Sequence, residues 1–259
     1  MKILFVGDIV GACGRGIFFD SLPSLKREHA LDMVIVNGEN AAHGKGITLN
    51  ISEELFEAGV DVITMGNHVW NNKDIFQILE YNSRVIRPAN LPADNPGRGS
   101  VVCEVGGVKV GVLNLLGQVF MDPCDCPFAA AVREVETLRQ ETDVIIVDMH
   151  AEATSEKMAM GWLLDGRVSA VLGTHTHIQT ADEKILPKGT AYITDVGMTG
   201  AYYSVLGMDR KMIVDRFVTK LPQKFTLADG GAQLNGVVLD IDEASGKSRS
   251  ITRLSFTDF

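Results

Sequence analysis

The sequence predicts an α/β fold in which two sheets pack together and helices cover them on the outside. Short apolar runs alternate with amphipathic stretches through the first two thirds of the 259 residues, the pattern of a largely parallel sheet built from βαβ units. Two pairs of strand-like runs joined by glycine-containing turns predict hairpins. No linker, internal repeat or low-complexity tract divides the chain, so we expect one domain over residues 1–259.

The predicted elements follow in order along the chain. Apolar runs predict strands at residues 3–7, 33–36, 62–65, 144–147 and 170–173. Asn50, with Glu53 three residues later, indicates a helix start before Leu55. Apolar side chains at helical spacing predict a helix over Ile75, Ile78 and Leu79 and another over Phe128, Ala131, Val135 and Leu138. The predicted hairpins are 101–105 with 108–112, and 237–241 with 251–256.

Charge and hydropathy exclude several classes of partner. Lys and Arg number 24 against 33 Asp and Glu, a net charge of −9, and we find no positive cluster that would attract a polyanion. We therefore expect neither duplex nucleic acid nor a membrane as a partner.

The apolar run at residues 3–6 is too short for a signal peptide, so we expect a cytoplasmic protein. Its four cysteines, Cys13, Cys103, Cys124 and Cys126, should then be thiols.

Polar side chains follow each predicted parallel strand at the point where the strand ends. The carboxyl ends of parallel strands converge on one edge of a sheet, where ligands bind. Five strands therefore deliver carboxylates, amides and imidazoles to one rim. The residues concerned are Asp8, Glu39, Asn40, Asn67, His68, His150, His175 and His177. A histidine that merely packs in the core would account for one of these imidazoles, but not for four beside two acids.

The rim residues suit a pair of metal ions. Two carboxylates, two amides and several imidazoles form a mixed oxygen and nitrogen ligand set, without cysteine, that suits iron, manganese or zinc. Seven of the groups, all except His68, exceed the four or so ligands that one zinc ion takes. Two ions that share a bridging carboxylate explain this number most economically.

These motifs resemble those of the calcineurin-like metallophosphoesterase superfamily, which run Asp-x-His, Gly-Asp, Gly-Asn-His, His and Gly-His-x-His. The matching stretches are Gly7-Asp8-Ile9-Val10, Gly38-Glu39-Asn40, Gly66-Asn67-His68, Asp148-Met149-His150 and Gly173-Thr174-His175-Thr176-His177. Val10 stands where the first motif usually has His, and Glu39 replaces the usual bridging Asp. These departures, and the Asp-Val-Gly-Met-Thr-Gly segment at 195–200, resemble the YmdB-like bacterial branch. The resemblance covers nearly the whole chain.

The resemblance implies a four-layer α/β/β/α sandwich of two mixed sheets with a binuclear metal centre. It implies that Asp8, Glu39, Asn40 and His177 hold one ion and that Glu39, Asn67, His150 and His175 hold the other. Asn40 would then stand in for the histidine that is missing at Val10. An amide oxygen is a harder donor than imidazole, which favours iron or manganese while leaving zinc as an alternative.

The resemblance also implies an activity. It implies a phosphodiesterase that acts on cyclic nucleotides. The preferred substrates would be 2′,3′-cyclic nucleotides, which are opened to 3′-phosphates, and 3′,5′-cyclic AMP would be a lesser substrate. The resemblance also implies a homo-oligomer. His68 directly follows a ligand and would serve as the general acid; the alternative is that its ring orients Asn67. Alternative functions are a phosphomonoesterase, another small phosphodiesterase, or a regulatory protein that senses a nucleotide.

Other residues have two interpretations. Asp148 lies two residues before His150 and either fixes its tautomer or is a solvated or capping residue. Arg15, after a predicted turn at residues 11–14, is a phosphate ligand or a surface residue. Asp195 and Thr199 either rim the site or belong to a glycine turn.

Overall fold

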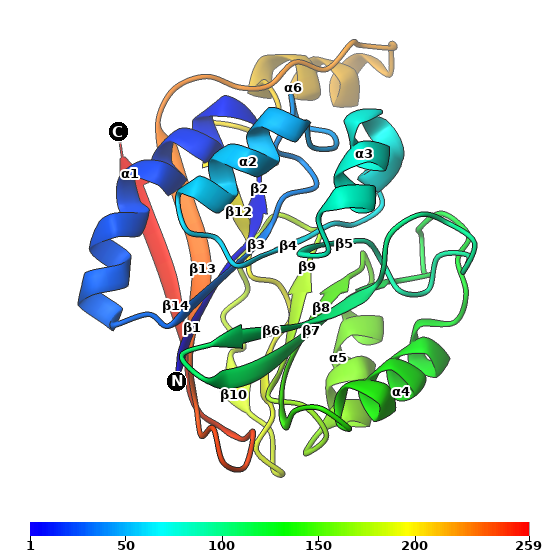
Figure 1. The fold of residues 1–259 in the computed structure, drawn as a ribbon. Coiled ribbons are helices and arrows are strands. Elements are labelled where there is room, and N and C mark those ends of the chain that lie inside the picture. The colour runs from blue at the N-terminus through cyan, green and yellow to red at the C-terminus, as the bar shows by residue number, and fades with distance from the viewer. Residues whose placement is uncertain (259) are drawn as a thin grey trace.

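A computed structural model describes residues 1–258 and shows two sheets packed face to face, with helices on both outer faces (Figure 1). The first sheet has eight strands in the order β2-β12-β13-β1-β3-β4-β5, and β14 pairs with β13. Their bounds are β1 Lys2–Val6, β2 Asp8–Ile9, β3 Met33–Asn37, β4 Val62–Thr64, β5 Val85–Ile86, β12 Met198–Ala201, β13 Ala232–Ile241 and β14 Ser248–Asp258. Parallel pairing joins β1, β3, β4 and β5, whereas β13 runs antiparallel to β1.

The second sheet has six strands in the order β10-β11-β9-β8-β7-β6. Their bounds are β6 Ser100–Val105, β7 Val108–Leu116, β8 Val144–His150, β9 Ala170–Thr174, β10 Lys184–Ile185 and β11 Ala191–Ile193. Strands β7, β8, β9 and β11 are parallel, and β6 and β10 pair antiparallel at the two edges. Both sheets are therefore mixed.

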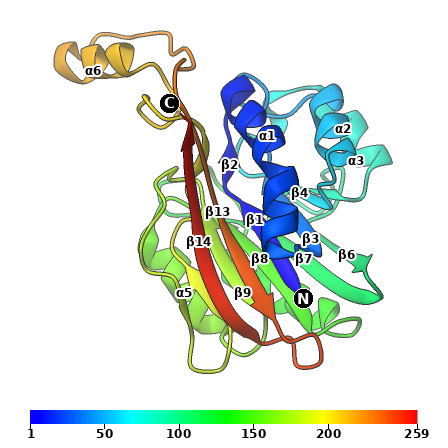
Figure 2. The ribbon, with the colours of Figure 1, turned by 90° about the vertical axis from the view of Figure 1, so that its left-hand side faces the viewer.

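The helices divide between the two outer faces. Those on the first sheet are α1 Gly11–His29, α2 Leu49–Glu57 and α3 Asp74–Tyr81, and those on the second are α4 Pro127–Leu138 and α5 Thr154–Leu164. A short 3₁₀ helix spans Val69–Asn71. The last helix, α6 Arg210–Thr219, stands apart from the sheets beyond one end of them (Figure 2). No helix within residues 1–258 is long and apolar enough to cross a membrane.

Three apolar layers hold the four structural layers together. Along β1, Leu4 and Val6 pack toward the helices of the first sheet, whereas Ile3 and Phe5 pack between the two sheets. This alternation is what a strand buried on both faces requires, because successive side chains point to opposite sides. A third layer joins the second sheet to α4 and α5. The α/β/β/α prediction is confirmed.

The predicted strands and hairpins are confirmed, and two local predictions are wrong. The helix predicted to start at Asn50 is α2, which begins at Leu49 because the Thr48 hydroxyl accepts the Ile51 N–H at 3.2 Å. The turn predicted at residues 11–14 is the first turn of α1. A Cβ at Gly14 would overlap the carbonyl oxygen of Thr199, so the glycine lets α1 pack directly on β12.

Strands β1 and β13, which are far apart in the sequence, are neighbours in the middle of the first sheet. Strand β1 pairs with β13 from Lys2 opposite Asp240 to Val6 opposite Gly236. The terminal amino group of Met1 donates to the Ile241 carbonyl oxygen at 2.7 Å. Strand β2, which carries Asp8, pairs with β12, where Met198 lies opposite Asp8. The first rim residue is thus positioned by strands that come about 190 and 230 residues later in the sequence.

Candidate metal centre

The structure brings the predicted rim residues together at one end of the two sheets. Asp8 is on β2, the pair Glu39 and Asn40 follows β3, and the pair Asn67 and His68 follows β4. The second sheet contributes His150, which ends β8, and His175 and His177, which follow β9. The carboxyl ends of parallel strands from both sheets therefore build one site, as the sequence predicts.

His150 lies at the centre of a tight cluster of ligand atoms. Its Nε2 is 3.0 Å from Asn67 Oδ1, 3.1 Å from the Glu39 carboxylate and 3.1 Å from His175 Nδ1. One ligand atom each from Glu39, His150 and His175 lies within 4.8 Å of the others, which is compatible with a shared metal ion. Gly66 faces this cluster, and a Cβ there would overlap both the Glu39 carboxylate and the His150 ring.

Asp8, Asn40 and His177 extend the cluster on one side. Asp8 Oδ1 lies 3.9 Å from His177 Nε2, and Asp8 Oδ2 accepts the His175 N–H at 3.2 Å. The Asn40 amide nitrogen donates to the Gly44 carbonyl oxygen at 3.0 Å. Among the described residues, neither Asp8 Oδ1 nor Asn40 Oδ1 has a hydrogen-bond partner, although both are buried.

These two oxygens test whether the residues fit a metal. A buried acceptor without a donor is costly, and native structures almost always satisfy such atoms. A cation satisfies oxygen lone pairs that no protein donor reaches. The carboxylate, amide and imidazole donors here are also the types that iron, manganese and zinc accept. The residues present therefore fit a metal centre.

The pKa values of Glu39, His150 and His175 also fit a metal centre. Burial alone would raise the pKa of Glu39, but the charge of His150, their hydrogen bond and the nearby His68 lower it to about 2. Burial alone would lower the pKa of His150, and the opposing charge of Glu39 raises it to about 9. Burial and the charge of His150 lower the pKa of His175 to about 3. A proton on His150 thus balances the buried carboxylate, and a metal cation would take over that balance because its ligands bind deprotonated.

A buried polar network orients His150. The Thr174 hydroxyl donates to Asp148 Oδ1 at 2.6 Å, and its oxygen lies 2.8 Å from His150 Nδ1. Asp148 Oδ2 accepts from the Thr64 hydroxyl at 2.5 Å and from the Asn37 amide at 3.0 Å. With Nδ1 donating to Thr174, Nε2 is left to face the ligand cluster. Asp148 therefore acts on His150 through Thr174, and it also ties the two sheets together.

A second buried network holds the loop that carries His175 and His177. Both histidines have left-handed backbones, with φ of 95° and 64°. Asp195 Oδ2 accepts from the Thr176 hydroxyl at 2.6 Å and from its N–H at 3.0 Å, between the two histidines. Lys157, which is fully buried, donates to the same oxygen at 2.7 Å. The strained loop is fixed by a buried ion pair.

His68 lies beside the ligands without using its ring for the cluster. Its backbone N–H donates to Glu39 Oε2 at 2.9 Å, and its ring Nδ1 lies 2.9 Å from Asn71 Oδ1. With Nδ1 paired to Asn71, Nε2 remains available for proton transfer. His68 also lines the cavity described below.

Of the residues with two interpretations, Arg15 and Thr199 lie outside the ligand cluster. The Arg15 guanidinium donates to the Ala41 carbonyl oxygen at 2.6 Å, and Thr199 is buried with its hydroxyl 3.3 Å from the Asn235 carbonyl oxygen. Sequence reasoning missed Glu152, whose carboxylate lies 3.3 Å from His175 Nε2. Its position two residues after His150 is the one signal that would have suggested it.

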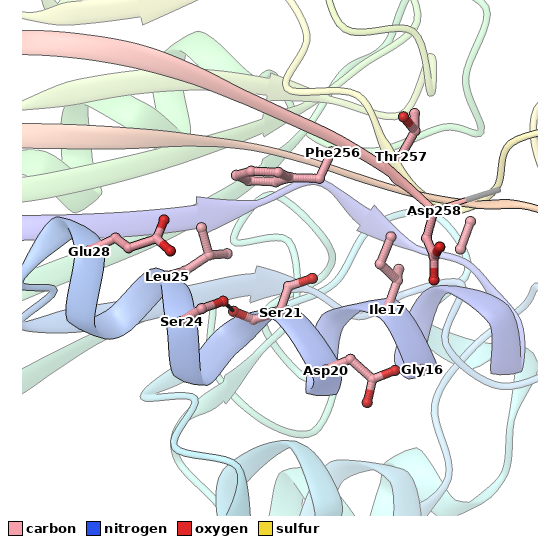
Figure 3. A pocket seen from close by; sticks show the side chains of 11 residues that line it. Gly16, Ile17, Asp20, Ser21, Ser24, Leu25, Glu28, Phe256, Thr257 and Asp258 are labelled. Atoms are coloured by element: carbon pink, nitrogen blue, oxygen red, sulfur yellow. Dashed lines mark hydrogen bonds between the residues drawn. The ribbon is translucent and has the colours of Figure 1, made fainter.

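A cavity of about 570 Å³ opens beside the cluster. Its wall includes Glu39, Asn40, His68, His175 and His177, and also Lys45 and Arg216. A separate cavity of about 470 Å³ lies between α1 and β14 (Figure 3). That second cavity is lined by the carboxylates of Asp20, Glu28 and Asp258, which would repel a phosphate. The wall of the first cavity contains Glu39 and Glu152 but also Lys45, Arg216 and candidate metal ligands, so a phosphate-bearing ligand fits it better.

Comparisons with known proteins agree on one family. The family model described as YmdB-like protein matches residues 4–254. The chain is 50% identical to the 2′,3′-cyclic-nucleotide 2′-phosphodiesterase of Bacillus subtilis (strain 168), over 100% of this chain and 98% of that protein. A solved structure described as a novel phosphatase from Mycoplasma pneumoniae superposes with a TM-score of 0.93 at 40% identity, covering 99% of this chain and 93% of that one.

The fold extends to more distant proteins. The structure of a 5′-nucleotidase precursor from Thermus thermophilus has a TM-score of 0.56 at 15% identity, over 98% of this chain and 54% of that one. At that identity the likeness concerns the fold alone. The match over nearly the full length, the identity to curated relatives and the four-layer architecture lead to one assignment. The chain belongs to the YmdB-like protein family and is an enzyme with the calcineurin-like metallophosphoesterase fold.

Proposed function

We propose that this enzyme is a metal-dependent phosphodiesterase that hydrolyses 2′,3′-cyclic nucleotides to 3′-phosphates. The observation that carries the proposal is the pair of buried, unpartnered oxygens of Asp8 and Asn40 beside the cluster of Glu39, His150 and His175. The Bacillus subtilis relative, which carries this activity in its name, supports the substrate class.

Seven residues would hold two ions in this proposal. Asp8, Glu39, Asn40 and His177 would hold one ion, and Glu39, Asn67, His150 and His175 the other. The ions are iron or manganese, with zinc as the alternative, because the set combines hard oxygen donors with imidazoles. When bound, two ions lower the pKa of a water nucleophile and offset the charge of the phosphate.

His68 supplies the proton that the leaving group needs. Opening the cyclic ester to a 3′-phosphate breaks the bond between phosphorus and the 2′ oxygen, and that oxygen leaves as an alkoxide. The backbone N–H of His68 donates to the Glu39 carboxylate, and its ring Nδ1 pairs with Asn71 Oδ1. Its Nε2 then protonates the 2′ oxygen as general acid.

The remaining expectations complete the proposal. The substrate is a small phosphodiester rather than duplex nucleic acid or a membrane lipid, in keeping with the net charge of −9. Residues 1–259 act as one metallophosphoesterase domain. We expect the enzyme to work in the cytoplasm, and the family resemblance implies a homo-oligomer.

The proposal is tested by separating the products formed from 2′,3′-cyclic AMP in the presence of manganese. The expected product is 3′-AMP, and a 2′-phosphate, or faster release of phosphate from nucleoside monophosphates, contradicts the proposal. His68→Ala should keep both metals yet lose about 10²–10⁴-fold in rate, whereas His29→Ala, at the far end of α1, should lose nothing. The rate of hydrolysis of bis-p-nitrophenyl phosphate, whose leaving group is already acidic, should fall much less in His68→Ala. Equal losses on both esters, or a missing ion, would assign the proton to another group.

The ligand assignment is tested by elemental analysis. Glu39→Ala should lower occupancy at both ion sites, because the proposal makes Glu39 the bridge. Asn67→Ala should mainly empty one site. Two full equivalents of metal in purified Glu39→Ala protein would refute the bridging role.

A further inference from the structure

The cavity beside the candidate metal centre has two unlike walls. One wall consists of candidate metal ligands and His68. The other comes from the segment around α6, and its apolar members are Val205, Leu206, Met208, Ile213, Phe217 and Phe225. A small, highly charged ester needs no such wall, because its hydration favours a polar surface.

We propose that the apolar wall around Phe225 is a subsite for the nucleobase of the substrate. This inference rests on the proposed function and deepens it, since it names the feature that would separate nucleoside cyclic phosphates from phosphodiesters without a base. The ligand class is a purine or pyrimidine nucleoside whose phosphate lies at the metal side of the same cavity.

The geometry of the substrate places its base and its phosphate in the same cavity. In a 2′,3′-cyclic nucleotide the phosphate ring is fused to the ribose, so the base is held at a short, fixed reach from phosphorus. A phosphate beside Glu39 and His175 must therefore have its base within the same hollow. The volume of about 570 Å³ lies in the usual range for small-molecule sites, roughly 300–1,000 Å³.

The chemistry of the wall is the second argument. Phe225 is 40% exposed, so part of its ring is available to a ligand. The guanidinium of Arg216 lies 4.9 Å from the centroid of that ring, a cation–π contact that orients Phe225. Aromatic rings are the usual platform for a nucleobase because every base offers a π face.

Charge complementarity is the third argument. Lys45 and Arg216 line the same cavity, together with the carboxylates of Glu39 and Glu152. Glu39 would be held by the metal ions of the proposed centre, which leaves Lys45 and Arg216 to offset Glu152 and to favour an anionic ligand that also carries an apolar group. A nucleotide combines both features, whereas an apolar peptide segment carries no phosphate to place at the metal side.

The test compares Phe225→Ala with wild type on two cyclic esters, 2′,3′-cyclic AMP and the base-free glycerol 1,2-cyclic phosphate. We expect KM for 2′,3′-cyclic AMP to rise about 5- to 150-fold, the range for losing one base–aromatic contact, with kcat nearly unchanged. The kcat/KM for the base-free ester should not change. Val218→Ala is the matched control, since Val218 lies on the same α6 helix but outside the cavity lining. Phe225→Tyr should restore most of the affinity.

Equal losses on both esters would overturn the subsite, because Phe225 would then act through the metal centre or the fold of the segment. A change in particle mass of Phe225→Ala by light scattering would assign the ring to an interface between copies of the chain. If the wild type does not cleave 2′,3′-cyclic AMP, the proposed function fails separately. Calorimetry then still decides the subsite: 3′-AMP should bind more tightly than glycerol phosphate in wild type, and equal affinities would refute it.

Discussion

Replacing Thr174 by valine removes one hydroxyl that joins two buried polar groups, and its cost can be worked out from the structure. Thr174→Val keeps the shape of the side chain, but Asp148 Oδ1 loses its 2.6 Å donor and His150 Nδ1 loses its 2.8 Å partner. All three residues are fully buried. Each unsatisfied buried group costs about 1–3 kcal/mol, so the loss of partners for two groups should lower the free energy of unfolding by about 2–6 kcal/mol. Metal affinity should also fall by about 10- to 100-fold, because His150 loses its orienting partner.

Urea denaturation in the presence of a chelator measures the first effect, and competition with a coloured chelator measures the second. Thr137→Val is the matched control, since the Thr137 hydroxyl makes one bond to the Arg133 carbonyl oxygen on the exposed face of α4. That control should change the free energy of unfolding by no more than about 0.5 kcal/mol. If Thr174→Val is as stable as Thr137→Val and binds metal as tightly as wild type, the network does not orient His150.

Three more predictions concern two other buried residues and the half-buried Cys124. Lys157→Met leaves the fully buried Asp195 carboxylate unpaired, so we expect a loss of about 3–5 kcal/mol in the free energy of unfolding by urea titration; no loss would contradict the buried pair. Gly66→Ala places a Cβ against Glu39, and chelator competition should show weaker metal binding with an unchanged circular dichroism spectrum. Burial raises the pKa of Cys124 to about 11, so only about one thousandth is thiolate at pH 8. Its labelling by iodoacetamide, followed by mass spectrometry, should rise about tenfold per pH unit up to pH 10, and a rate independent of pH is the opposing result.

The strands and the residues at their ends could be predicted from the sequence because both depend on local patterns. A buried parallel strand reads as a short apolar run, and the rule that ligands bind at carboxyl ends then places the polar residue that follows. His150, for example, can be predicted as a site residue from the apolar run that precedes it. The same reasoning fails for β12, whose residues Met198–Ala201 include glycine and threonine and show no strand-like pattern.

The supporting networks could not be predicted because their partners lie far apart in the sequence. Asp195 meets Lys157 38 residues away, and Thr64 meets Asp148 84 residues away. Nothing in the local sequence distinguishes Lys157 from a lysine on the solvent side of an amphipathic helix. The start of α1 was missed for a different reason, since glycine disfavours helix in isolation and Gly14 is required by packing against β12.

The pairing of β1 with β13 also has a consequence for how the chain acquires its site during synthesis. Strand β1 is made first, yet its antiparallel neighbour includes Asp240, opposite Lys2. Contacts at such sequence separation make folding slow, because the long loop between the strands must close before the pairing stabilises it. On the ribosome, nearly the whole chain must emerge before the first sheet is complete. Asp8, although near the amino terminus, is therefore among the last rim residues to reach its final place, so incomplete chains would lack a finished candidate metal centre.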